Sequence, residues 1–212
     1  MKRKENLKQY GIDELILSLG QFINDIQQIR NRLPIAELQG DARHVALAGM
    51  QTTLVPIVFS LKCISYTANN IDRETLGGFL RMPTQKLTYY TDSHIKSSLS
   101  VFFHFKIENL FTNVLLALNP TYSERGYEKI STDFFNSITL ANKEYIKNCI
   151  KVLASLRNGF HKEGIHRNSD FTHTVSGYEW KFIRGEVINM EIFNLISLLK
   201  TIVSGLDSIL IS

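Results

Sequence analysis

The chain has 212 residues, of which 44% are apolar and 21% are charged, the profile of a globular protein and not of a disordered one. Its four prolines and twelve glycines are too few for collagen-like repeats or a β-sandwich with many turns. The net charge of +4 is compatible with a polyanionic partner but does not require one.

Long helices are predicted for the first half of the chain. Over residues 12–33 the apolar side chains recur every three or four positions, the spacing of one helix face. Pro34 is expected to end that helix. A second helix is expected over residues 42–69, where Pro56 should kink or split it. Residues 70–90 are rich in glycine and polar side chains and are expected to form a loop.

Three more helical segments follow before the pattern changes. The first covers residues 92–118 and is rich in phenylalanine, with Asp92 or Ser93 as its N-cap. Its aromatic density indicates a central position in the fold. A shorter helix is expected within residues 122–138, and a strongly periodic one over residues 141–156.

The C-terminal part predicts a hairpin and a last helix. Residues 172–188 are rich in β-branched and aromatic residues and contain an alternating run, YEWKFI, so they are expected to form a β-hairpin. Helical spacing resumes over residues 192–210. The expected fold is all-α, a bundle of about five to six helices with a small β-hairpin before the last helix. The expected core includes Phe22, Ile26, Leu99, Phe102, Leu110, Ile146, Leu153, Phe193, Leu199 and Leu206.

Cysteine usage and hydropathy predict the compartment. Cys63 and Cys149 lie far apart in apolar helical patterns, without metal-binding spacing, and are expected to be buried free thiols. The basic N-terminal residues 1–8 do not lead into a signal sequence, although they offer cations to a phosphate backbone. No window approaches about 20 consecutive apolar residues, so we expect a cytoplasmic protein without a membrane span.

A basic segment follows the helix of residues 141–156 and reads SLRNGFHKEGIHR. Arg157 and His161 are four positions apart, so on a continuing helix they lie about 40° apart on one face. An arginine binds phosphate oxygens through a planar fork, and a histidine exchanges a proton near neutral pH. Together the two residues carry the groups needed to cleave RNA without a metal, with Asn158 orienting either partner or the phosphate.

In that reaction His161 would deprotonate a 2′-hydroxyl or protonate the leaving 5′-oxygen. Arg157 would offset the charge that builds on the phosphate. Lys162, His166 and Arg167 continue the basic segment and are expected to bind RNA. No cofactor and no metal site is expected, because the chain has no phosphate-loop, zinc-protease or dinucleotide-binding motif.

A helical bundle whose late core helix carries an arginine, a polar residue and then a histidine resembles the HEPN superfamily. Arg157, Asn158 and His161 match this motif, with a shorter spacing between arginine and histidine than the family usually has. The resemblance implies one HEPN-like domain over residues 1–212 that acts as a metal-independent endoribonuclease in a toxin–antitoxin or phage-defence system. It also implies an antiparallel homodimer or heterodimer whose facing arginine and histidine side chains form one cleft.

Other interpretations of the same residues remain open. A HEPN-like fold without catalysis would be a binding or scaffold module for RNA, a nucleotide or a protein partner. Alternatively, the Asn158-Gly159 step would be a left-handed helix cap, with solvated cations at the negative end of the helix dipole. Glu108 would either orient His161 or face solvent. The phenylalanines within residues 102–111 would either fill the core or stack with bases.

Overall fold

The computed structural model describes residues 9–33, 41–70, 84–162 and 164–211, together with residues 75 and 78. The helices are α1 (Gln9–Arg32), α2 (Ala42–Asn70), α4 (Thr84–Leu118), α5 (Tyr127–Ser137), α6 (Lys143–Phe160) and α7 (Ile192–Ile211). Strands β1 (Phe171–Val175) and β2 (Tyr178–Phe182) form an antiparallel hairpin. The prediction of a mostly helical fold with a small hairpin before the last helix is confirmed.

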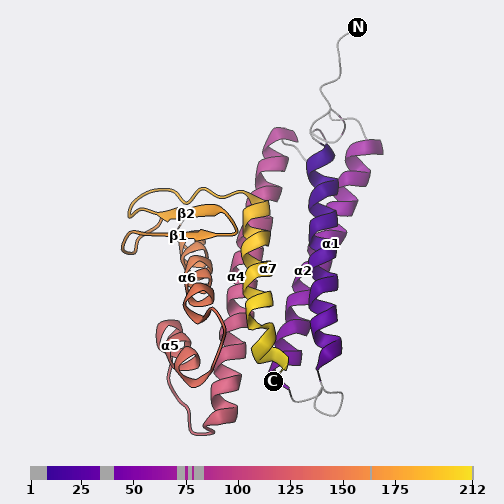
Figure 1. Ribbon diagram of the computed structural model, residues 1–212. Helices are drawn as coiled ribbons and strands as arrows, with labels where there is room; N and C mark the ends of the chain where they lie inside the picture. Colours follow the sequence, from indigo (N-terminus) through magenta and orange to yellow (C-terminus); the bar gives the residue numbers. More distant parts are fainter. Residues whose placement is uncertain are drawn as a thin grey trace.

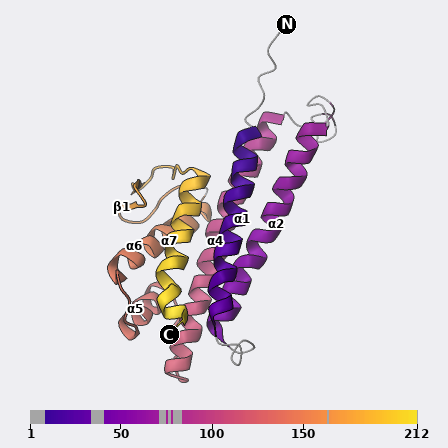
Figure 2. The ribbon, with the colours of Figure 1, turned by 45° about the vertical axis from the view of Figure 1, so that its right-hand side comes forward.

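Helix α4 occupies the centre of the arrangement, as its aromatic density predicts. It contacts α2 on one side and both α5 and α6 on the other. Helices α1, α2, α4 and α7 run roughly alongside one another, whereas α5, α6 and the hairpin lie together on the far side of α4 and α7 (Figures 1 and 2). The last turn of α6, which carries the predicted site, therefore lies next to α4.

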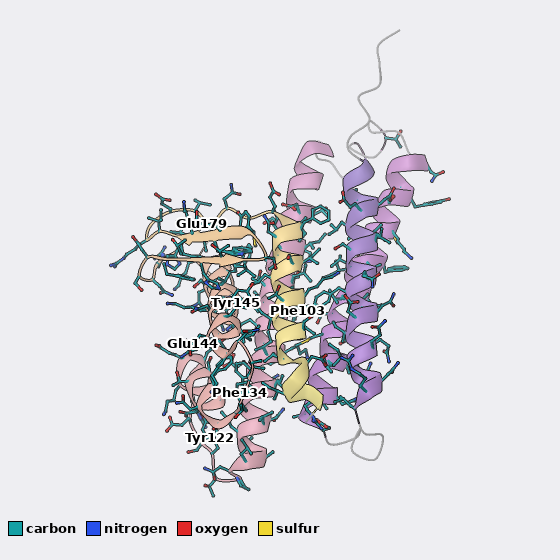
Figure 3. The ribbon with its side chains drawn as sticks, viewed as in Figure 1. Phe103, Tyr122, Phe134, Glu144, Tyr145 and Glu179 are labelled. Carbon is teal, nitrogen blue, oxygen red and sulfur yellow. The ribbon has the colours of Figure 1, made fainter. Side chains whose placement is uncertain are left out.

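The core is built by aromatic contacts that α4 makes on two sides. The ring of Phe103 stacks on Phe22 of α1 with centroids 5.6 Å apart, and Phe111 stacks on Phe134 of α5 at 3.9 Å (Figure 3). The predicted core residues are buried, with the exceptions of Phe193, which is partly buried, and Phe102, which is 50% exposed. Adjacent helical residues point about 100° apart, so the inward position belongs to Phe103 and Phe102 faces outward.

Two helices differ from their predicted course. Of the two outcomes predicted for Pro56, a kink or a split, the split does not occur, because α2 continues through Pro56. Helix α4 begins at Thr84, because residues 84–90 contain no glycine or proline and continue the helix in the N-terminal direction. Asp92 therefore lies inside α4, where it pairs with Lys96, and does not cap it. Pro34, residues 1–8 and most of the predicted loop over residues 70–90 lie outside the described residues.

The hairpin turns on two residues with positive φ. Ser176 has a φ of 50° and Gly177 a φ of 81°, the combination found in tight two-residue turns that match the twist of the strands. The side chains of Val175, Trp180 and Phe182 are buried against the helices. The hairpin thus packs against α6 and α7. Hydrogen bonds between His166 and residues 185–186, just after β2, hold the segment that follows α6.

Helices α2 and α4 leave an apolar surface exposed, which we call the α2–α4 face. Its large members are at least half exposed, and they are Val45, Val55, Phe59 and Tyr66 of α2 with Phe102 and Phe105 of α4. Between them the side chain of Lys106 lies across Gly49, where α4 and α2 meet. Cys63, predicted to be buried, is also exposed on α2, whereas Cys149 is buried as predicted.

The same two helices satisfy a membrane criterion. Segments Ala42–Thr67 and Thr91–Leu118 are long and apolar enough to cross a bilayer, and only 28% and 33% of their most apolar windows are buried. Length and composition alone do not separate a membrane span from an apolar bundle helix. Much of the apolar surface of α2 and α4 is therefore not covered by the other elements of the fold.

Candidate functional site

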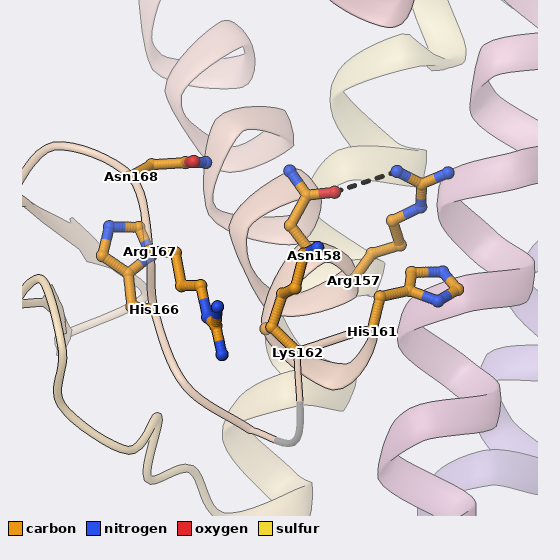
Figure 4. A pocket seen from close by; sticks show the side chains of 8 residues that line it. Arg157, Asn158, His161, Lys162, His166, Arg167 and Asn168 are labelled. Carbon is orange, nitrogen blue, oxygen red and sulfur yellow. Dashed lines mark hydrogen bonds between the residues drawn. The ribbon is translucent and has the colours of Figure 1, made fainter.

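A cavity of about 460 Å³ lies where α6 ends and the chain turns toward the hairpin (Figure 4). Every residue predicted for the site lines it. The lining consists of Arg157, Asn158, Gly159, His161, Lys162, His166, Arg167 and Asn168. The fold therefore gathers the predicted residues in one place, although they contribute to the cavity in different ways.

The end of α6 is fixed by two glycines. The N–H groups of Lys162 and Gly164 both donate to the carbonyl oxygen of Gly159, at 2.8 Å each. Beyond the C-cap His161, Gly164 has a φ of 82°, a left-handed conformation that glycine adopts readily, and there the chain turns away from the helix. Asn158 and Gly159 stay helical, which corrects the interpretation of that step as the cap. Packing requires a glycine at position 159, because a Cβ there would lie 2.2 Å from Cδ1 of Ile188.

Arg157 and His161 extend from this last turn toward α4 (Figure 4). Arg157 is half-buried, and its Nη1 donates a hydrogen bond of 2.9 Å to Oδ1 of Asn158. Asn158 thereby restrains the guanidinium fork. His161 is exposed, so its imidazole is open to solvent and to a substrate. A guanidinium, whose fork suits phosphate oxygens, and an imidazole, which can exchange a proton near neutral pH, thus lie one helical turn apart.

Lys162 and Arg167 extend on the side of the cavity away from α4 (Figure 4). Both side chains are exposed. Within the described ranges, neither forms an ion pair with an acidic side chain. Cations that form no ion pair among the described residues contribute a positive potential, which attracts a polyanion.

His166 lines the cavity from its buried side and is only 3% exposed. Its Nε2 lies 3.0 Å from the carbonyl oxygen of Ser169, to which it donates. Its main chain exchanges hydrogen bonds with Glu186 and Gly185 beyond the hairpin, at 3.0 and 2.8 Å. The imidazole also packs 5.3 Å from the ring of Phe182. His166 therefore anchors the loop to the hairpin, and the expectation that it binds RNA is corrected because its ring is not accessible.

A buried polar cluster between α4 and α5 lies within the electrostatic reach of Arg157. The ring of His104 packs on the ring of Tyr127 with centroids 4.2 Å apart, and its Nδ1 lies 3.8 Å from Oε2 of Glu108. Burial and then the charge of Arg157 lower the pKa of His104 to about 4. Burial raises the pKa of Tyr127 well above its ordinary value. Both groups are thus uncharged at neutral pH.

Only part of this cluster could be recognised from the sequence. His104 and Glu108 are four positions apart on a helix, a spacing that brings their side chains together. The structure places Glu108 beside His104, where the sequence analysis expected it to orient His161 or to face solvent. Tyr127 joins the cluster only through the packing of α5 on α4, which no local pattern indicates.

Comparisons with protein-family models, with curated proteins and with solved structures give no match to this chain. The description of the site therefore depends on its own geometry. In the part of the chain that the structure describes, no three His, Cys, Asp or Glu side chains are grouped so that they could hold a metal ion. The groups that the cavity offers are the guanidinium of Arg157, an exposed imidazole, two amides and two further cations.

Proposed function

We propose that the protein is a metal-independent endoribonuclease of the HEPN type, in which Arg157 and His161 act on one phosphodiester. The observation that carries the proposal is that the two side chains extend together from the last turn of α6 into a cavity lined by further cations. A fixed guanidinium beside an exposed imidazole suits a phosphodiester whose neighbouring 2′-hydroxyl is the nucleophile. This is the chemistry of RNA.

The chemistry assigns each side chain a role. One imidazole removes the proton of the 2′-hydroxyl, and the 2′-oxygen attacks phosphorus. The bond from phosphorus to the 5′-oxygen breaks, and that oxygen leaves with a proton from an imidazolium. The products are a 2′,3′-cyclic phosphate and a 5′-hydroxyl. Arg157, restrained by Asn158, holds the phosphate oxygens and offsets their added charge, while Lys162 and Arg167 bind a flanking phosphate.

The two proton transfers favour a dimer, because a single protomer offers one exposed imidazole, His161, within the described lining of the cavity. A second copy would supply the other one. The α2–α4 face supports this arrangement, because Phe105 directly follows His104 on the helix toward which Arg157 and His161 extend. A partner seated on this face would cover exposed aromatic side chains and lie next to the cavity. By the resemblance, the setting is a cytoplasmic toxin–antitoxin or phage-defence system.

A binding module without catalysis is the second candidate. The observation that favours it is the short spacing between Arg157 and His161, which keeps both on one turn of the helix. The same cations would then hold RNA, a nucleotide or an acidic protein partner without cutting.

One assay separates the two functions. Purified protein is incubated with single-stranded RNA in excess EDTA, and the new ends are identified by their chemistry. The proposal predicts cleavage that leaves 2′,3′-cyclic phosphates. RNA that is bound and remains intact would favour the binding module. RNA that is neither bound nor cut would reject both.

A further inference from the structure

His104 and Tyr127 bury polar atoms that the structure leaves unsatisfied. The side chain of His104 is 3% exposed, and its Nε2 has no hydrogen-bond partner among the described residues. The hydroxyl of Tyr127 is buried beside it and also meets no partner at hydrogen-bond geometry among the described residues, although Ser131 of the same helix lies near enough to act on its pKa. A buried polar atom without a hydrogen bond destabilises the folded state. A phenylalanine at either position would avoid that cost, so the polar atoms need a reason.

The hydrogen positions on His104 follow from its neighbours. Its Nδ1 faces the carboxylate of Glu108 at 3.8 Å. That distance is too long for a hydrogen bond, but the negative charge of the carboxylate favours the tautomer that carries its proton on Nδ1. The lone pair of Nε2 is then a buried acceptor without a donor.

Arg157 is the group that can supply this donor. A guanidinium has five N–H groups, and among the described residues the one side-chain hydrogen bond of Arg157 goes to Asn158. The side chain of Arg157 extends toward α4, the helix that carries His104 (Figure 4). Its charge also acts on the pKa of both His104 and Tyr127. Because burial and this charge lower the pKa of His104 to about 4, its imidazole stays a neutral acceptor near pH 7 and does not repel the guanidinium.

We propose that His104 and Tyr127 are positioning residues that, together with Asn158, hold the guanidinium of Arg157, with the charge of Glu108 favouring the tautomer of His104 that accepts at Nε2. The hydrogen bonds from the guanidinium of Arg157 to Nε2 of His104 and to the hydroxyl oxygen of Tyr127 form when Arg157 binds a phosphate. Such contacts are often long in a free protein and shorten in the complex. This inference rests on the proposed function for the identity of the phosphate, which is the scissile one of RNA. The arrangement limits the guanidinium to one orientation toward that phosphate.

Matched variants separate positioning from packing. His104→Phe keeps an aromatic ring and removes the acceptor, whereas His104→Gln supplies an amide oxygen near the same place. Tyr127→Phe removes the hydroxyl alone, and it provides the test if His104→Phe does not fold.

We expect His104→Phe and Tyr127→Phe to have melting temperatures no lower than that of the wild type. Both should cleave RNA with a kcat/KM about 10- to 100-fold lower. His104→Gln should recover part of the loss of His104→Phe. Activity within twofold of wild type in folded His104→Phe and Tyr127→Phe, or no advantage of Gln over Phe, would overturn the proposal.

A second readout does not depend on RNA cleavage. The guanidinium N–H signals of Arg157, assigned by their loss in Arg157→Lys, are recorded by nitrogen-15 NMR with and without inorganic phosphate. Restrained rotation should give resolved signals with phosphate in the wild type and in His104→Gln, and averaged signals in His104→Phe. Identical signals in wild type and His104→Phe under both conditions would reject the positioning role, whatever the RNA assay shows. If the wild type does not cleave RNA but the signals differ as expected, the proposed function fails and the positioning role stands.

Discussion

The imidazole of His104 on α4 lies 4.2 Å, between ring centroids, from the phenol of Tyr127 on α5, with the ring planes inclined by 50°. The contact joins the central helix to a short one that packs over it. It buries a titratable ring beside the charge of Arg157, and the folded protein therefore keeps His104 neutral at pH values at which an unfolded chain would protonate it.

Acid should consequently destabilise the fold. The pKa of His104 falls from 6.5 in an unperturbed histidine to about 4 in the folded protein. Between these values the unfolded state binds a proton that the folded state does not, so the free energy of unfolding falls as the pH drops from 6.5 to about 4. The loss from His104 is at most roughly 3 kcal/mol. Burial lowers the pKa of His173 as well, which acts in the same direction.

Urea denaturation at about pH 7 and about pH 4.5 measures this effect. Wild type should lose more stability between the two conditions than His104→Phe, which has no titrating group at that position. An equal loss in both proteins would mean that His104 is not held neutral by the fold.

Two helical glycines should respond to alanine in opposite directions. A Cβ at Gly205 of α7 would lie 2.1 Å from Cδ1 of Ile146 on α6, whereas a Cβ at Gly20 of α1 meets nothing within 4 Å. We expect Gly205→Ala to lower the free energy of unfolding by about 1–3 kcal/mol through overpacking. Gly20→Ala should raise it by about 0.5–1 kcal/mol, because alanine favours a helix. Chemical denaturation checks both, and adding Ile146→Val should return part of the loss at Gly205. Stabilisation by Gly205→Ala would contradict the close contact of α6 and α7.

The hairpin turn should depend on Gly177. Its φ of 81° is a region that L side chains rarely adopt. Gly177→Ala is therefore expected to lower the free energy of unfolding by about 1 kcal/mol. Ser176, with a φ of 50°, is the matched position, and Ser176→Asn should be tolerated because asparagine accepts this conformation. Thermal unfolding that leaves Gly177→Ala as stable as Ser176→Asn would show that the turn is not the one described.

The α2–α4 face should be the dimer interface if the proposed function holds. Phe59→Ser and Phe105→Ser remove exposed apolar area from this face, so each should weaken self-association by at least about tenfold. Leu17→Ser removes an equally exposed apolar side chain from α1 and is the control. Sedimentation at tens of micromolar, the range of transient interfaces, measures the association. A wild-type monomer, or equal loss in Leu17→Ser, would rule out a dimer through this face.

Helical spacing predicted the course of most elements because one face of each helix is buried against a neighbour. It placed α5 and α6 within a few residues of their observed bounds. The errors arise where tertiary packing decides. Phe102 and Phe103 are chemically identical and adjacent, and only the packing of α1 on α4 determines which one is buried.

The candidate site likewise could be predicted from local spacing only in part. Arg157 and His161 could be paired from their spacing alone, because a helix brings residues four apart to one side. The burial of His166 could not be predicted, since it depends on hydrogen bonds with Gly185 and Glu186 far along the chain. The proximity of His104 to Arg157 likewise requires α4 and α6 to be side by side.

The most direct test of the proposed endoribonuclease is the rate at which site variants cleave single-stranded RNA in EDTA. We expect His161→Ala to lose about 10²- to 10⁴-fold, as for a general acid or base. Arg157→Lys should lose at least about tenfold, since lysine keeps the charge but not the planar fork. His94→Ala and Arg184→Lys change exposed residues away from the cavity lining and should cleave at the wild-type rate. Full activity in both His161→Ala and Arg157→Lys would contradict the assignment of the site.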